Sequence, residues 1–130
     1  MSYRSEKLKE IIGVTFESVI RENDEILFTA KDGRRWVMYY EPDCCASCDI
    51  DEIHGDLADL EGSPILQAEY ESNSDKPRES EYADDSFTWG FFKLATIKGS
   101  VTIRWYGSSN GFYSEEACFA SVGDDGQRIY

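Results

Sequence analysis

The sequence predicts an α+β fold, in which one or two short helices pack on a twisted, mostly antiparallel sheet of about seven strands. Three observations lead to this prediction. With 130 residues, 41% of them hydrophobic, the chain is long enough to bury a core as a single domain over residues 1–130. Most of its apolar residues alternate or form short runs between turn signals, as strands do. Two stretches instead show the spacing of a helix.

The first forty residues predict a short helix and then a β-meander. Residues 5–13, SEKLKEIIG, have helical spacing and end at glycine, which is favoured just after a helix. Turn signals at 23–24 (ND) and 32–33 (DG) divide the next stretch into three β-rich runs. In the third run, residues 36–40, both alternating sets of side chains are apolar. We therefore expect that strand to be covered on both faces.

The middle of the chain predicts a second helix, a strand and a loop. Four apolar residues follow a helical spacing before Pro64: Ile50, Ile53, Leu57 and Leu60. Because Gly55 weakens a helix by roughly 1 kcal/mol, two short turns are the alternative. Residues 65–72, ILQAEYES, read as a strand. The polar, highly charged residues 72–85 are expected to form a mobile acidic loop.

The last third predicts a hairpin, a final strand and a tail. Residues 86–97 and 100–107 alternate as strands around a tight turn, KG, at 98–99. Trp105 is expected to pack into the core. Residues 112–122 read as the final strand, and residues 123–130, GDDGQRIY, as a loosely held tail.

The net charge of −13 lies entirely in one segment. Residues 41–85 hold fifteen acids and two bases, whereas the remaining residues hold eleven of each. A field of this sign repels phosphate, so direct binding of nucleic acid is disfavoured. The same field favours encounter with a basic protein surface, although an acidic loop can also serve solubility alone. No apolar run is long enough to span a bilayer and no signal peptide is visible, which predicts a cytoplasmic protein without membrane contact.

The cysteines raise the question of a metal site. The stretch DCCASCD at 43–49 contains a C-x₂-C pair, Cys45 and Cys48, which His54 and Cys118 could complete as zinc ligands. The second half of such a site would come from isolated residues, so the signal is weak. A catalytic thiol is disfavoured because the surrounding carboxylates raise a thiol pKa. Buried structural thiols are the remaining interpretation, and no cofactor is expected.

A second group of candidates surrounds the turn RWYGSSNGFYS at 104–114. It combines a guanidinium, two phenols and small polar groups, the types enriched where proteins bind partners. The alternative is an ordinary hairpin whose aromatic side chains pack inward. With three acids of the charged segment, these residues form the predicted partner- or ligand-binding set: Arg104, Tyr106, Ser109, Asn110, Tyr113, Asp43, Asp84 and Asp85.

Three motifs, DCC at 43–45, GDLADLEGSP at 55–64 and TIKGSVTIRWYGSSNG at 96–111, resemble a family of short proteins of unknown function encoded by tailed bacteriophages and prophages. The resemblance covers residues 10–119. In the family pattern the pair Cys44-Cys45 recurs, whereas Cys48 and Cys118 do not recur regularly, which implies that DCCASCD is a structural turn.

The resemblance implies an accessory protein in the cytoplasm of an infected bacterium. We therefore expect a non-enzymatic protein that binds, and inhibits, a host or anti-phage defence protein with a basic surface. Imitation of nucleic acid charge is one version of this hypothesis. A nucleotide-binding protein that uses Arg104, Tyr106 and Tyr113 is the first alternative, and a small zinc-stabilised domain is the second.

Overall fold

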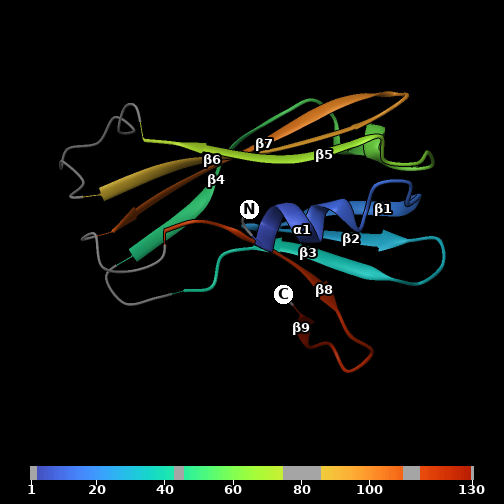
Figure 1. The fold of residues 1–130 in the computed structure, drawn as a ribbon, viewed down its shortest axis with the longest axis horizontal. Helices are drawn as coiled ribbons and strands as arrows, with labels where there is room; N and C mark the ends of the chain where they lie inside the picture. The colour runs from blue at the N-terminus through green and yellow to red at the C-terminus, as the bar shows by residue number, and fades with distance from the viewer. Residues whose placement is uncertain (1–2, 43–45, 75–85, 110–114, 130) are drawn as a thin grey trace.

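The computed structural model describes residues 3–42, 46–74, 86–109 and 115–129, and it shows two sheets that pack face to face (Figure 1). The strands of the first sheet are, in spatial order, β1 (Phe16–Glu22), β2 (Glu25–Ala30), β3 (Arg35–Tyr39), β8 (Cys118–Val122) and β9 (Arg128–Ile129). Those of the second are β4 (Ala46–His54), β7 (Gly99–Ser109), β6 (Ser86–Thr96) and β5 (Gln67–Asn73). Neighbouring strands within each sheet are antiparallel.

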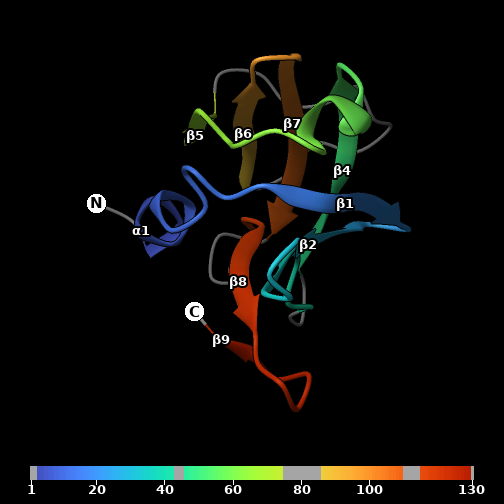
Figure 2. The same cartoon turned by 90° about the vertical axis from the view of Figure 1, so that its right-hand side faces the viewer.

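The predicted α+β class is therefore wrong, because the fold is mostly β. The described residues form one α-helix, α1 (Tyr3–Lys9), and one 3₁₀ helix, η1 (Leu57–Leu60). The predicted single sheet is instead divided in two, and both sheets contribute to one hydrophobic core. Helix α1 contacts β5 of one sheet and β8 of the other, and it lies at the side of the molecule between them (Figure 2). No helix among the described residues is long and apolar enough to cross a membrane.

The helix predicted over residues 50–60 is wrong because a β-bulge imitates helical spacing. Ile50 pairs with Trp105 and Ile53 pairs with Ile103, and the register shifts between them at Asp51. One inserted residue allows two positions three apart to face the same side of a strand. Ile50 and Ile53 both reach the core in this way, as i and i+3 would on a helix.

The predicted meander is confirmed in strands β1 to β3. β3 is buried on both faces, as its sequence indicates: Trp36 and Met38 belong to the main core, whereas Val37 and Tyr39 belong to a smaller cluster with Cys118 and Ala120. At the β2–β3 turn, Asp32 accepts hydrogen bonds from the backbone and side chain of Arg34. The side-chain bond from Arg34 is the main cause that holds the pKa of Asp32 below its usual value.

The hairpin of β6 and β7 is the longest in the fold. Thr96 pairs with Gly99, so the turn lies at Ile97 and Lys98, one residue before the predicted position. Trp105 is buried as predicted, and its indole Nε1 donates to the Met38 sulfur at 3.3 Å. β7 continues to Ser109, and the predicted strand at 65–72 is β5, which ends at Asn73. Residues 75–85, most of the predicted acidic loop, lie outside the described residues.

Candidate functional site

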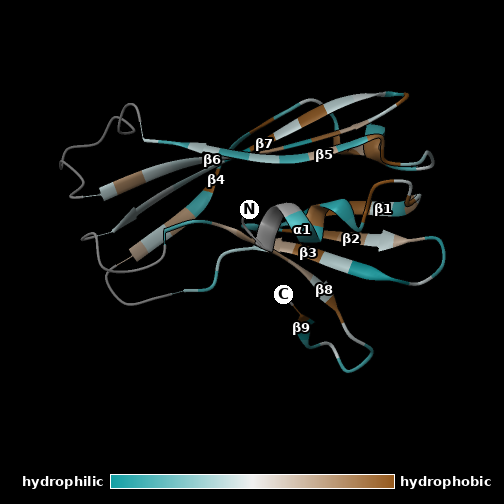
Figure 3. Cartoon of the chain, viewed as in Figure 1, coloured by the Kyte–Doolittle hydropathy of each residue, from teal (hydrophilic) through white to brown (hydrophobic). Residues whose placement is uncertain are grey.

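The outer face of the four-stranded sheet brings aromatic and charged side chains together. Core-facing residues of β7, such as Ile103 and Trp105, alternate with outward-facing Arg104 and Tyr106. Strand pairing then places on the same outer face the aromatic row of β6 and the acids of both edge strands: Phe87, Trp89, Phe91, Asp49, Asp51, Glu52, Glu69 and Glu71. We call this surface the aromatic–acidic face. In Figure 3 the β5 ribbon is mostly hydrophilic in colour, in agreement with its glutamates.

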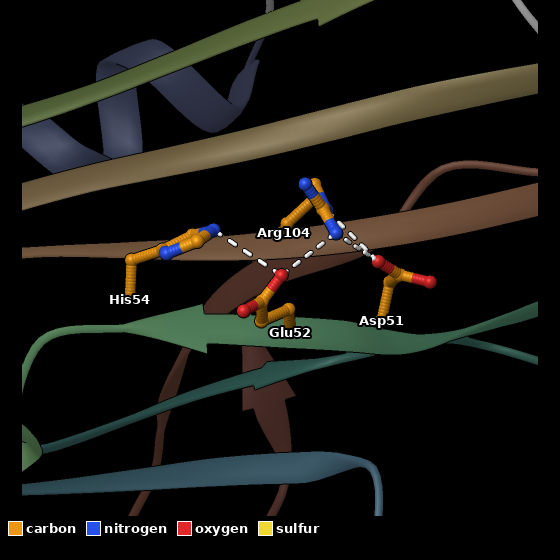
Figure 4. Close-up of polar contacts among 4 residues, drawn as sticks. All are labelled: Asp51, Glu52, His54 and Arg104. Atoms are coloured by element: carbon orange, nitrogen blue, oxygen red, sulfur yellow. Dashed lines mark hydrogen bonds and ion pairs between the residues drawn. The ribbon is translucent and has the colours of Figure 1, made fainter.

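Arg104 lies at the centre of this face and is held by two acids of β4. Its Nε and Nη2 donate to Asp51 Oδ2 at 2.8 and 2.6 Å, and Nη2 also donates to Glu52 Oε2 at 2.8 Å (Figure 4). The bulge explains this geometry, because two residues of a bulged strand oppose one residue of its partner. His54 Nε2 lies 3.3 Å from Glu52 Oε2, which extends the network along β4.

A chain of aromatic rings begins beside Arg104. The guanidinium carbon lies 5.2 Å from the centroid of Trp89, within the range of a cation–π interaction. Trp89 in turn contacts Tyr106, with ring centroids 4.6 Å apart, and Phe87 stacks on Tyr106 at 6.2 Å. Tyr106 is buried although it points outward, whereas Phe87 and Trp89 are half-buried and stay partly accessible to solvent. The face is thus preorganised around Arg104.

Comparison with known proteins gives a family for this chain. The model of a domain of unknown function, DUF7448, matches residues 9–119. The chain belongs to the DUF7448 family. No curated protein and no solved structure matched it. The family match covers eight of the nine described strands at least in part and excludes β9, so the aromatic–acidic face lies wholly within the family domain.

The structure brings together two of the predicted binding residues, Arg104 and Tyr106, on one face. Ser109 does not join them, because it belongs to the alternate set of β7 side chains that faces inward with Trp105. The other five predicted residues lie outside the described residues: Asn110, Tyr113, Asp43, Asp84 and Asp85. The anion-binding role expected for Arg104 is disfavoured, because a phosphate would have to displace Asp51 and Glu52 from its guanidinium.

The predicted zinc ligands that the structure describes do not converge. Cys48 of β4 packs against the main core, whereas His54, on the same strand, is exposed. The two residues are six positions apart, which corresponds to about 20 Å because a strand rises about 3.3 Å per residue. Cys118 lies in the other sheet, in the smaller cluster. Cys45 falls outside the described residues, and within those residues no three potential ligands form a metal-binding group.

Sequence reasoning missed the aromatic row of β6 and the acids that hold Arg104. Phe87, Trp89 and Phe91 share one alternating set, but the opposite set contains Phe92 and Leu94, so apolar content alone does not say which set faces outward. A signal was present in the partner strand: Arg104 and Thr102 mark the outward set of β7. Because paired residues of β6 and β7 face the same side of the sheet, this pairing places Trp89 on the outer face with Tyr106.

The Arg104 network gives a first prediction. Asp51→Asn is expected to lower the free energy of unfolding by about 1–2 kcal/mol, because it weakens two charge-assisted hydrogen bonds to a side chain that is about two-thirds buried. Glu71→Gln is the matched control. It breaks the more exposed pair with Lys93 on the same face, which contributes about 0.5 kcal/mol or less. Urea denaturation of both variants measures the difference, and equal effects would contradict a structural role for Asp51.

Proposed function

We propose that this protein is a non-enzymatic binding protein that engages a basic surface of another protein through its aromatic–acidic face. The observation that carries the proposal is the half-buried row Phe87, Trp89 and Phe91, which remains partly accessible to solvent and has an acid-bearing strand on each side. A sheet face directed to solvent needs no aromatic row for stability, whereas protein interfaces are enriched in aromatic residues and arginine. The row supplies apolar contact area and the acids supply charge complementarity.

The charge balance of the face supports a basic partner. Asp49, Asp51, Glu52, Glu69 and Glu71 carry five negative charges, and Lys93 and Arg104 carry two positive ones, so the face has a net charge of −3 with His54 neutral. A surface of one sign accelerates encounter with a partner of the opposite sign and disfavours other acidic proteins. This charge belongs to the face itself and does not depend on the acidic residues 75–85.

The arrangement of the acids supports imitation of nucleic acid. The acid-bearing strands β4 and β5 are the two edges of the sheet, with β7 and β6 between them. Three inter-strand steps of about 4.8 Å place their backbones about 14 Å apart. That separation is similar to the width of about 12 Å of the major groove of B-DNA, whose edges are rows of phosphate. A nucleic-acid-binding site on the partner would therefore face two rows of negative charge whose separation is close to that of the phosphate rows in DNA.

The resemblance to phage-encoded proteins points to the class of partner. By this analogy, the basic protein is a host or anti-phage defence factor in the bacterial cytoplasm, and occupation of its nucleic-acid site inhibits it. This assignment rests on the resemblance, whereas the binding face rests on the contacts described above. Nucleotide binding through Arg104 is less well supported, because its guanidinium already binds two carboxylates.

Affinity capture from nuclease-treated bacterial lysate tests the proposal. The wild-type protein is expected to retain a dominant basic partner at low salt and to lose it at moderate salt, with affinity falling about tenfold as charges are screened. The double variant Glu69→Gln/Glu71→Gln should weaken capture without unfolding the protein, since both side chains are exposed. Binding of nucleic acid to the captured partner should then be inhibited competitively by the wild-type protein.

The matched control places the same charge change on the other sheet. Glu17→Gln/Glu22→Gln on β1 removes two exposed carboxylates away from the aromatic–acidic face, and capture should be retained. A partner that resists salt and binds both double variants equally would contradict a role for the charge of this face. A salt-sensitive partner whose nucleic-acid binding is unaffected would keep the binding function and reject the mimicry.

A further inference from the structure

A mainly apolar cavity of about 310 Å³ lies on the outer face of the first sheet, beside the C-terminal hairpin. The hairpin forms because Gly123 and Gln127 close a turn, with the Gly123 amide 2.8 Å from the Gln127 carbonyl, and β9 then pairs with β8. From β9, Arg128 reaches across the sheet: its Nη2 lies 3.0 Å from both carboxylate oxygens of Glu25, and its guanidinium carbon lies 4.2 Å from the centroid of Tyr39. Arg128 and Gly126 thereby form one wall.

The floor of the cavity is part of an apolar row that crosses four strands. Ile20 pairs with Leu27, Leu27 with Val37, and Val37 with Ala120, so the four side chains stand in lateral register. Val37 and Ala120 are buried, Leu27 is half-buried and Ile20 is half-exposed. Leu27, Val37 and Val122 line the cavity itself. Within the cavity, a short hydrocarbon chain would therefore lie against the partly exposed Leu27 and Val122, above the buried Val37.

Arg35 lies at the rim and differs from the other arginines. Of the five arginine side chains that the structure describes, four form ion pairs with carboxylates: Arg21, Arg34, Arg104 and Arg128. Arg35 instead donates through Nη2 to the backbone carbonyl of Gly123 at 3.1 Å, and the described residues place no carboxylate within ion-pair distance of it. In a chain with a net charge of −13, an arginine that has no acidic partner among the described residues and that lies beside an apolar cavity is a candidate anion-binding group.

We infer that this cavity binds a small amphipathic carboxylate, with its hydrocarbon chain on Leu27 and Val37 and its carboxylate on Arg35. The volume lies at the lower end of the range of about 300–1,000 Å³ typical of ligand sites, which suits a short chain. A singly charged head group fits better than a polyphosphate, because the net charge of the protein repels anions in proportion to their charge. This site is separate from the aromatic–acidic face, and its test is independent of the proposed function.

Titration of ¹⁵N-labelled full-length protein with octanoate, followed by amide chemical shifts, tests the inference. Saturable shifts are expected at Leu27, Val37 and Gly126, and not on the four-stranded sheet. Octanol, which keeps the chain and removes the charge, should bind about tenfold more weakly, as a charge-assisted hydrogen bond implies. Butyrate, which keeps the charge and shortens the chain, should also bind more weakly because it covers less apolar surface.

Two arginine variants distinguish binding of the carboxylate by Arg35 from a general effect of the net charge of the protein. Arg35→Gln should weaken octanoate binding about tenfold. Arg21→Gln removes an exposed arginine of β1 that is paired with Asp24 and does not line the cavity, so binding should be unchanged. The inference is overturned if octanoate causes no saturable shift at the cavity, if Arg35→Gln and Arg21→Gln bind it equally, or if octanol or butyrate binds as tightly as octanoate.

Discussion

Phe119→Ala is expected to lower the free energy of unfolding by about 3–5 kcal/mol, the range for truncation of a fully buried phenylalanine. Phe119 lies on β8, and its side chain is inaccessible to solvent. Its ring centroid is 5.6 Å from that of Phe28 in its own sheet and 6.4 Å from that of Phe92 in the other sheet. The substitution therefore leaves a cavity at the contact between the two sheets, which the surrounding structure relaxes only partly to fill.

Phe91→Ala is the matched control for this prediction. Phe91 precedes Phe92 on β6 but points to the aromatic–acidic face and is half-buried. Its truncation exposes a surface and leaves no internal void, so a loss of about 1 kcal/mol is expected. Urea denaturation followed by tryptophan fluorescence compares the two. Equal losses would contradict the packing of the sheets through Phe119.

Local sequence signals predict the strands correctly where turn residues separate runs of alternating side chains. The meander of β1 to β3 was predictable because ND and DG turns interrupt β-rich runs, and the burial of β3 on both faces followed from its two apolar sets. They failed at β4, where the bulge at Asp51 shifts the phase of the alternation. A bulge depends on the partner strand, and no feature within residues 46–54 distinguishes its spacing from one turn of helix.

The candidate site was less predictable than the fold because it is built across strands. Arg104 and Tyr106 were recognisable by residue type, but the carboxylates that hold Arg104 come from β4, more than fifty residues earlier in the chain. Their approach depends on the β4–β7 register. Sequence reasoning therefore treated Arg104 as available to an anion, whereas the structure pairs it internally. Dense acidic sequence alone could not show which carboxylates lie beside it.

Gly107→Ala is expected to destabilise the protein by about 3 kcal/mol or more, at or above the upper end of the effect of overpacking. Gly107 lies in β7 between Cys48 of β4 and Thr88 of β6, in the interior of the second sheet. A Cβ at this position would lie 1.6 Å from the backbone carbonyl oxygen of Glu115. A backbone atom cannot rotate away as a side chain can, so either the segment at Glu115 or the sheet must move.

Movement of Glu115 would also break the contacts that its side chain makes. Its Oε1 accepts hydrogen bonds from Ser86 Oγ at 2.7 Å and Thr88 Oγ1 at 3.0 Å, which tie this segment to the start of β6. Gly123→Ala is the matched control, because the nearest atom to its added Cβ is a side-chain atom, Asp125 Oδ1, at 3.1 Å, so that only a small side-chain shift is needed. We expect that variant to stay within about 0.5 kcal/mol of wild type in urea denaturation. If Gly107→Ala were equally mild, the close approach of the Glu115 backbone to β7 would be wrong.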